Sequence, residues 1–190
     1  MTAESANHRT KQILAESLRA IMKTKKLDRI TIADVVKECG VSRRAFYYHF
    51  KDIYDATWWL VEEDWKDRID FDAEDWRGNM RELLHYFEEN RDFVSAVLDS
   101  SQSQRMEELF RLKIKDSFKR YLTEADRDHV VTEQDAELLS QYYTTILTAT
   151  LGGWIRGTIR CSDERLMTLV YESTEASLTR TVRTIGEYPV

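Results

Sequence analysis

A short run between Arg43 and Lys51 concentrates side chains that can bind nucleic acid. On a helical wheel of about 100° per residue, Arg43, Tyr47 and Lys51 share one side, with Arg44 and Tyr48 beside them. An arginine can donate two hydrogen bonds to a guanine edge, and lysine, tyrosine and helix N-termini bind phosphate oxygens. The outer side of this helix therefore carries the chemistry of a DNA-reading element.

Two neighbouring features would position this helix. Thr31 precedes an apolar-periodic segment and has Asp34 three residues later, which is a capping-box pattern with Asp in place of the usual Glu or Gln. Gly40 suits the left-handed conformation that ends a helix, and Ser42 can cap the next one. The spacing predicts a helix-turn-helix motif over residues 31–50.

The rest of the chain also has helical periodicity. An N-terminal helix from about Ser5 to Lys25 is expected to bury the stripe Ile13, Leu14, Leu18, Ile21 and Met22. Further helices are expected over 52–71, 80–90, 92–98, 107–122, 133–158 and 163–185. The chain has 190 residues, of which 42% are hydrophobic, and only 1 Pro and 6 Gly. These patterns predict an all-α protein of about nine helices.

Charge is distributed unevenly along the chain. The net charge is −6, yet residues 1–55 carry 11 Lys/Arg against 7 Asp/Glu, a net charge of +4, which leaves −10 for the remainder. A basic end on an acidic body is expected when one module touches phosphate and the other does not.

Residues 8–55 resemble the DNA-binding domain of the TetR (tetracycline-repressor) family. The resemblance rests on Ile30-Thr31-Ile32, on Cys39-Gly40-Val41-Ser42 and on Phe46-Tyr47-Tyr48-His49-Phe50-Lys51. It implies an all-helical homodimer that binds a double-stranded DNA operator through this N-terminal three-helix domain. It also implies that residues 56–190 form a helical domain for regulation and dimerisation.

The resemblance assigns roles to individual residues of the motif. It implies that phosphates are held by Thr31, Ser42, Tyr47 and His49. It implies that bases are faced by Arg43, Arg44 and Ala45, with Tyr48 at the edge. Many family members carry lysine where this chain has Ile53, so Lys51 is expected to replace that backbone contact, or the contact is absent.

The last two predicted helices carry an apolar stripe that can pair two subunits. Its members are Tyr143, Ile146, Leu147, Leu151 and Trp154 on the first helix and Leu166, Leu169 and Val170 on the second. A four-helix dimer bundle fits this pattern, and the alternative is a hairpin that packs only within its own chain.

Aromatic residues are frequent near the expected junction of the two modules. One interpretation is an effector pocket lined by Trp58, Trp65, Tyr86 and Phe110, and the other is an ordinary packed core. The stretch Phe46–Asp55 with Trp58-Trp59 is similar to the dihydroxyacetone-kinase regulator branch of the family. That similarity implies control by a partner protein instead of a small molecule.

These features predict a sequence-specific transcriptional regulator located in the bacterial cytoplasm. The alternative function is a helical interaction module that docks a partner protein, with weak or vestigial DNA binding. We expect no enzyme activity, cofactor or metal, because His49 has no supporting catalytic groups and Cys39 and Cys161 have no metal-like spacing. No run of the sequence is long and apolar enough to predict a membrane span.

Overall fold

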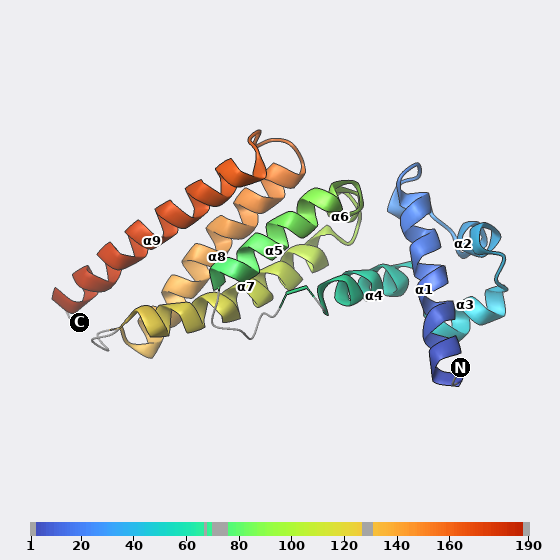
Figure 1. Ribbon diagram of the computed structural model, residues 1–190, viewed down its shortest axis with the longest axis horizontal. Coiled ribbons are helices and arrows are strands. Elements are labelled where there is room, and N and C mark those ends of the chain that lie inside the picture. The colour runs from blue at the N-terminus through green and yellow to red at the C-terminus, as the bar shows by residue number, and fades with distance from the viewer. Residues whose placement is uncertain (1–2, 67, 70–75, 127–130, 188–190) are drawn as a thin grey trace. The chain divides into compact units, whose positions relative to one another are not determined.

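The computed structural model describes residues 3–66, 68–69, 76–126 and 131–187. Within these ranges the protein has nine α-helices, one 3₁₀ helix and no strand (Figure 1), which confirms the predicted all-α class. The chain divides into two compact units. The first comprises Met1–Arg68 with Asp92–Ser103, and the second comprises Ile69–Arg91 with Gln104–Val190.

The helices follow the predicted order with shifted ends. The first unit contains α1 (Ala3–Met22), η1 (Leu27–Arg29), α2 (Ile32–Cys39), α3 (Arg43–His49), α4 (Ile53–Lys66) and most of α6 (Arg91–Leu98). The second unit contains α5 (Trp76–Glu89), α8 (Glu133–Ile155), α9 (Asp163–Glu187) and nearly all of α7 (Ser103–Ala125). The predicted continuation of the fourth helix to Phe71 enters residues outside the described ranges.

The core of the first unit forms where α1 packs against α2 and α4. Leu14, Leu18, Phe46 and Val61 are completely buried there. Ile13 was predicted to share the α1 stripe, but its side chain is 43% exposed. One residue along a helix turns the side chain by about 100°, so Ile13 cannot share the inward direction of Leu14 and Leu18.

Helix α6 completes the first unit by contacting α1, which also binds α4. The Arg19 guanidinium of α1 donates a 2.7 Å hydrogen bond to Asp64 of α4. The same guanidinium lies 4.6 Å from the centre of the Phe93 ring of α6. Residue 55, where the sequence placed a domain boundary, falls inside α4. The compact unit that presents α3 extends to Arg68 and includes Asp92–Ser103, and the 8–55 domain stays a prediction.

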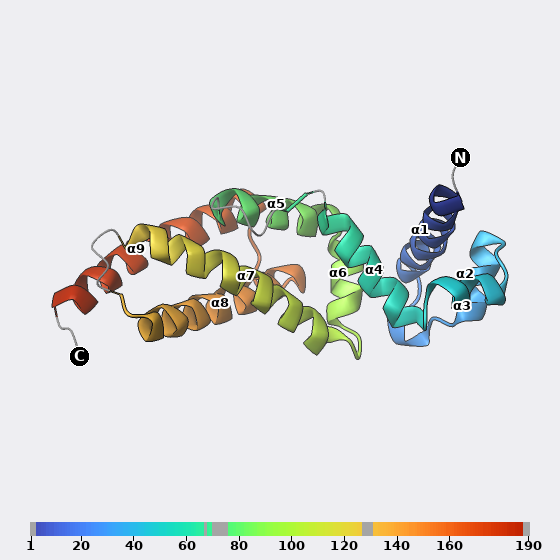
Figure 2. The same cartoon turned by 90° about the horizontal axis from the view of Figure 1, so that it is seen from below.

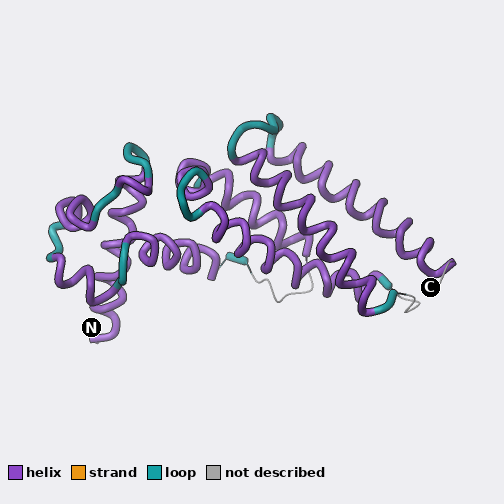
Figure 3. The backbone as a smooth tube through the Cα atoms, turned by 180° about the vertical axis from the view of Figure 1, so that it is seen from behind, coloured by secondary structure: helices purple, strands orange, loops and turns teal. Residues whose placement is uncertain are grey.

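Stacked and edge-on rings hold the second unit together. Trp76 of α5 lies 5.9 Å from Phe118 of α7 and 5.6 Å from Tyr171 of α9, measured between ring centres. Phe118 in turn lies 4.9 Å from Tyr143 of α8. The Tyr143 hydroxyl is 2.7 Å from that of Ser177 on α9, which runs antiparallel to α8 (Figures 1 and 3). These contacts join all four helices, of which α7, α8 and α9 are also visible from below in Figure 2.

The C-terminus of α8 is closed by a glycine cap. Gly157 has φ of 75°, and Thr158 N–H donates to the carbonyl of Gly153 at 2.9 Å, while Gly157 N–H donates to that of Trp154 at 3.1 Å. This is a Schellman motif, which satisfies carbonyls that the helix end would leave unpaired. Gly157 therefore lies beyond the helix, although the sequence pattern placed it inside.

Arg91 binds the same helix end from the start of α6. Its guanidinium donates to the carbonyls of Trp154 at 2.8 Å and Ile155 at 3.3 Å, and lies 4.3 Å from the centre of the Trp154 ring. The Trp154 indole N–H donates to the carbonyl of Cys161 at 3.0 Å. A cation at a helix C-terminus also opposes the negative end of the helix dipole.

Candidate nucleic-acid interface

The predicted helix-turn-helix motif is present, with its caps. Thr31 Oγ1 accepts from Asp34 N–H at 3.3 Å, and Asp34 Oδ2 accepts from Thr31 N–H at 2.7 Å, which completes the capping box. Gly40 ends α2 with φ of 70°, in the left-handed region. Ser42 Oγ then accepts from Ala45 N–H at 3.2 Å and starts α3. Local sequence therefore fixes both the turn and the start of α3.

Helix α3 separates its residues into an inner and an outer side. Phe46 and Phe50 are buried in the core, with ring centres 5.7 Å apart. The exposed side chains are Arg43, Arg44, Tyr47 and Tyr48, and Tyr48 is 76% exposed. Lys51 is also exposed, but it lies beyond the end of α3 at His49. Ala45 and His49 are half-buried between the two sides. Within α3 the arrangement follows the helical wheel, but the wheel was wrong to include Lys51, because the backbone is already extended at Phe50.

The cations on the outer side are not neutralised by the protein. Among the described residues, no carboxylate pairs with Arg43, Arg44 or Lys51, whereas Lys25 binds Asp34 at 2.6 Å. An unpaired cation keeps its full attraction for a phosphate, because no internal ion pair must be broken first. The exposed side of α3 is thus available to a polyanion.

Thr31 and Ser42 differ in what their hydroxyl groups can still do. The Thr31 hydroxyl donates to Asp34 Oδ2 at 2.7 Å and also accepts from the Asp34 backbone, so its proton is committed to the cap. The hydrogen bond from Lys25, followed by those from Thr31, lowers the pKa of Asp34 and keeps that acceptor ionised. Ser42 accepts from Ala45 and retains its own proton for a phosphate oxygen.

The surroundings of His49 favour its neutral form. Burial, and after it the charge of nearby Lys11, lowers the pKa of His49 below its usual 6.5. A neutral imidazole can donate one N–H to a phosphate but brings no positive charge. Lys11 itself lies 4.9 Å from the centre of the Trp59 ring and 5.3 Å from that of Phe50.

Ile53 belongs to the core at the start of α4 and is only 8% exposed. The adjoining Asp52 caps the helix, since its Oδ1 accepts from Asp55 N–H at 2.8 Å. Asp55 Oδ2 accepts from the Lys51 backbone N–H at 2.8 Å, so this contact uses the Lys51 backbone and not its ammonium group. Packing thus explains why an apolar residue occupies this position.

A hydrogen-bonded cluster around Asp28 ties the segment after α6 to η1 and α4, the elements on either side of the helix-turn-helix. The Asp28 carboxylate accepts from the Ser101 backbone at 2.9 Å, from the Ser101 hydroxyl at 2.8 Å and from the Tyr54 hydroxyl at 3.0 Å. These donors, Ser101 first, lower the pKa of Asp28 below its usual 3.8. Sequence reasoning missed this cluster because its members are far apart along the chain.

We expect Asp28→Asn to have a lower free energy of unfolding than wild type at neutral pH. In acid, the two proteins are expected to become equally stable. Because the folded state lowers this pKa, the ionised carboxylate stabilises the fold above pH 3.8, and that contribution is lost as the pH falls through the folded value. Urea unfolding at several pH values between neutrality and about pH 2.5 measures the difference. Asp116→Asn, which changes an exposed α7 carboxylate, is the control. An undiminished gap at the lowest pH contradicts the assignment.

Comparison with known proteins identifies the family. Residues 15–55 match the family described as bacterial regulatory proteins, tetR family, and residues 74–176 match that described as transcriptional regulator C-terminal region. The second match alone covers more than half of the chain. The chain belongs to the TetR family. It is a TetR-family transcriptional regulator, as its motif predicted.

Two similar proteins come from the branch that the sequence resembles. One is the HTH-type dhaKLM operon transcriptional activator DhaS of Lactococcus lactis subsp. lactis (strain IL1403), with 23% identity over 90 residues. That match covers 46% of this chain and 48% of DhaS, so it spans about half the length of the relative. The other is a solved structure, the dihydroxyacetone kinase operon activator DhaS. Its TM-score is 0.70 at 16% identity over 92% of this chain and 97% of that chain, which shows a shared fold.

The residues of the predicted dimer stripe in this TetR-family chain fall into a buried group and an exposed group. Six of its members are buried within their own chain: Tyr143, Leu147, Leu151, Trp154, Leu166 and Val170. Ile146 and Leu169 remain 45% and 50% exposed. Leu138 and Tyr142 are also exposed and lie about two turns and one turn before Ile146, respectively, so they share its side of α8. Leu138, Tyr142 and Ile146 are called the α8 face below.

The predicted effector-pocket residues do not form one site within either unit. Trp58 and Trp65 belong to the first unit, whereas Tyr86 and Phe110 belong to the second, and all four are buried. Phe87 bridges the latter two, with ring centres 5.9 Å from Tyr86 and 4.8 Å from Phe110. The packed-core interpretation describes these rings.

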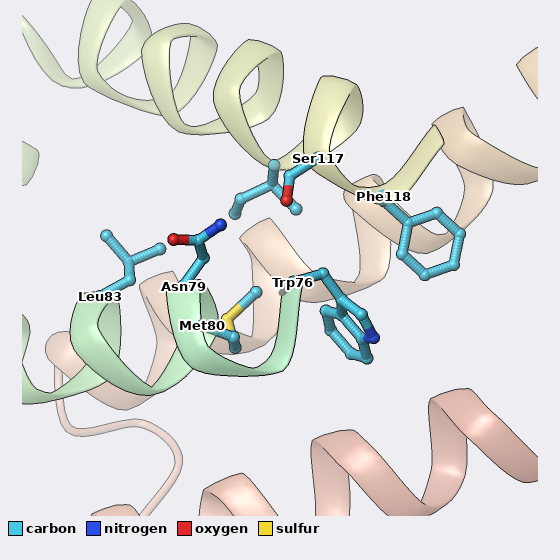
Figure 4. Close-up of a pocket in the computed structure, with 7 residues that line it drawn as sticks. Trp76, Asn79, Met80, Leu83, Ser117 and Phe118 are labelled. Atoms are coloured by element: carbon cyan, nitrogen blue, oxygen red, sulfur yellow. The ribbon is translucent and has the colours of Figure 1, made fainter. Parts of the chain in front are cut away.

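A cavity in the second unit lies between α5 and α7 instead (Figure 4). It is lined by Trp76, Asn79, Met80, Leu83, Ile114, Ser117 and Phe118. The sequence contained a signal for this cavity, because Asn79 and Ser117 are polar residues beside apolar positions of amphipathic helices. Among the described residues, no group of acidic, His or Cys side chains could hold a metal ion. None of the described helices has the length and apolarity needed to cross a membrane.

Proposed function

We propose that this TetR-family regulator binds a near-palindromic DNA operator as a homodimer, with one α3 helix in each of two successive major grooves. The observation that supports this most strongly is the outer side of α3, where Arg43, Arg44 and two exposed tyrosines project from one capped helix, with Lys51 just beyond its end. No carboxylate among the described residues pairs with these three cations. Arg43 and Arg44 face bases, with Ala45 close enough to contact a thymine methyl. Ser42, Tyr47, His49 and Lys51 hold phosphates, and Tyr48 lies at the edge.

Thr31 has a different role in this proposal from the one expected by resemblance. Its hydroxyl proton is donated to Asp34, so Thr31 positions α2 and offers no side-chain donor to phosphate. The protein acts without catalysis or cofactor, in the cytoplasm, under the control of an effector or a partner protein. Activation is the mode of regulation we favour, because both similar proteins are named activators.

The test is binding of the full chain to DNA fragments from upstream of its own gene. We expect a sequence-selective mobility shift that weakens steeply as salt rises, because phosphate binding releases counterions. If no fragment gives a selective, salt-sensitive shift, with or without cell extract, the alternative of a protein-interaction module with vestigial DNA binding replaces this proposal.

The α8 face and Leu169 form the subunit contact in this proposal. These side chains are apolar, exposed and unused by the chain's own core. The buried members of the predicted stripe then act indirectly, by holding α8 and α9 in place. The two α3 helices of such a dimer would be spaced by about 34–36 Å, one turn of DNA.

Ile146→Glu is expected to dissociate the dimer. A charge placed in an apolar contact must be desolvated without a partner, and loss of a contact of this kind costs about 2 kcal/mol or more, roughly thirtyfold in Kd. Sedimentation equilibrium measures the change. Leu112→Glu is the matched control, because Leu112 is comparably exposed but lies on α7. Equal dimer stability in Ile146→Glu and wild type contradicts the proposed contact.

A further inference from the structure

The cavity between α5 and α7 contains buried polar atoms that the protein does not pair. Trp76, Ser117 and Phe118 in its wall are 4%, 7% and 1% exposed. In the described part of the protein, Asn79 Nδ2 and Ser117 Oγ are both buried and have no hydrogen-bond partner. A buried donor without an acceptor costs about 1–3 kcal/mol, so two of them in one small space require an explanation.

The two atoms face the same space from opposite helices. The Asn79 carboxamide points from α5 toward α7, and the Ser117 hydroxyl points from α7 toward α5 (Figure 4). The indole nitrogen of Trp76, also unpartnered, is turned toward the Phe118 end of the cavity. A single oxygen atom between the helices could therefore serve Asn79 and Ser117 together.

The lining restricts what that oxygen can belong to. None of the seven lining side chains is charged, so a charged ligand would be buried without a counter-charge. A purely apolar ligand would leave both polar atoms unpaired. The free volume is about 10 Å³, close to the space one water molecule needs. Met80 lines the wall, and its unbranched side chain can move to admit a larger molecule.

We propose that the α5–α7 cavity binds the hydroxyl oxygen of a small uncharged molecule, which accepts a hydrogen bond from Asn79 Nδ2 and pairs with Ser117 Oγ. The oxygen comes either from water or from a short polyol such as glycerol. In both cases the oxygen links α5 to α7 by hydrogen bonds, and the molecule that carries it can exchange. The site is independent of DNA binding, and so are the measurements that test it.

Proton NMR of the full-length protein distinguishes the two sources. The side-chain amide protons of Asn79 are expected to show a nuclear Overhauser effect to bound water. If glycerol enters, its methylene protons replace the water signal in a saturable manner. Glycerol 3-phosphate serves as the charged probe and is expected to give no signal. Water or glycerol signals support the proposal, whereas the absence of both, or saturable binding of the phosphate, overturns it.

The sign of a stability change gives a second test. If Ser117 bonds to a bridging oxygen, Ser117→Ala lowers the folding equilibrium constant by roughly fivefold, the effect of one net hydrogen bond. If the Ser117 hydroxyl has no partner, its removal raises the folding equilibrium constant. The bridge also predicts that the effect of Ser117→Ala shrinks in an Asn79→Leu background.

Ser140→Ala is the matched control for this cycle. Ser140 is also a buried helical serine, but its hydroxyl donates to the Ala136 carbonyl of its own helix at 2.6 Å. Its effect is expected to be the same with and without Asn79→Leu. A stabilising Ser117→Ala, or effects of Ser117→Ala that are equal in both backgrounds, overturns the proposal.

Discussion

Arg44→Ala is expected to lower operator affinity by about ten- to a hundredfold and to remove the preference at one base position. The reason is that a bidentate arginine–guanine contact is worth about 1–3 kcal/mol of discrimination. The Arg44 guanidinium is exposed on α3 and is not held by a carboxylate in the described part of the chain. Competition binding with operators that differ at single positions measures the loss.

Lys51→Ala separates base reading from phosphate binding in the same experiment. This variant is expected to lower the affinity for all DNA sequences by the same factor. It is also expected to reduce the slope of log affinity against log salt concentration by about 1. Lys23→Ala removes an exposed cation outside α3 and is the control for net charge. If Arg44→Ala and Lys51→Ala both bind every sequence like wild type, α3 is not the reading helix.

Arg91→Ala is expected to destabilise the second unit by about 3 kcal/mol. The guanidinium makes two charge-assisted hydrogen bonds to the last carbonyls of α8 and stacks on the Trp154 ring. Charge-assisted bonds contribute about 1.5–3 kcal/mol each, and a cation–π contact about 0.5–2 kcal/mol, but these contributions overlap because one group makes them all. Truncation also leaves the buried indole with a gap beside it.

Urea unfolding monitored by far-ultraviolet circular dichroism measures this change. Arg91→Lys is expected to recover only part of the stability, because an ammonium cannot reproduce the planar geometry of the guanidinium. Arg165→Ala, at an exposed α9 position, is expected to stay within about 0.5 kcal/mol of wild type. If Arg91→Ala is as stable as Arg165→Ala, the contact with α8 is not a stabilising one.

The helix-turn-helix was predictable because its determinants are local. Thr31 with Asp34, Gly40, and Ser42 with Ala45 each act within three residues or at a single backbone position. The exposed and buried sides of α3 follow from helical periodicity alone. The Ile13 error is of the same local kind, since an apolar stripe drawn too widely includes a residue that faces solvent.

The C-terminal region was predictable as helices but not as surfaces. An apolar residue at helical spacing can face the core of its own chain or a second subunit, and the spacing is the same in both cases. Packing decided that Tyr143 and Leu147 turn inward while Ile146 turns outward. The four aromatic residues predicted to share a pocket belong two to each compact unit, and their meeting in one site stays a prediction.

The sequence by itself determined the all-α class, the TetR-type motif and the outer side of its reading helix. Each of these depends on residues within a turn or two of one another, where backbone geometry leaves few alternatives. Tertiary structure alone decided the Asp28–Ser101 contact, the capping of α8 by Arg91 and the meeting of Asn79 with Ser117. These pairs are separated by 38 or more positions, and only the packing of whole helices brings the first two into contact and places Asn79 and Ser117 in the wall of one cavity.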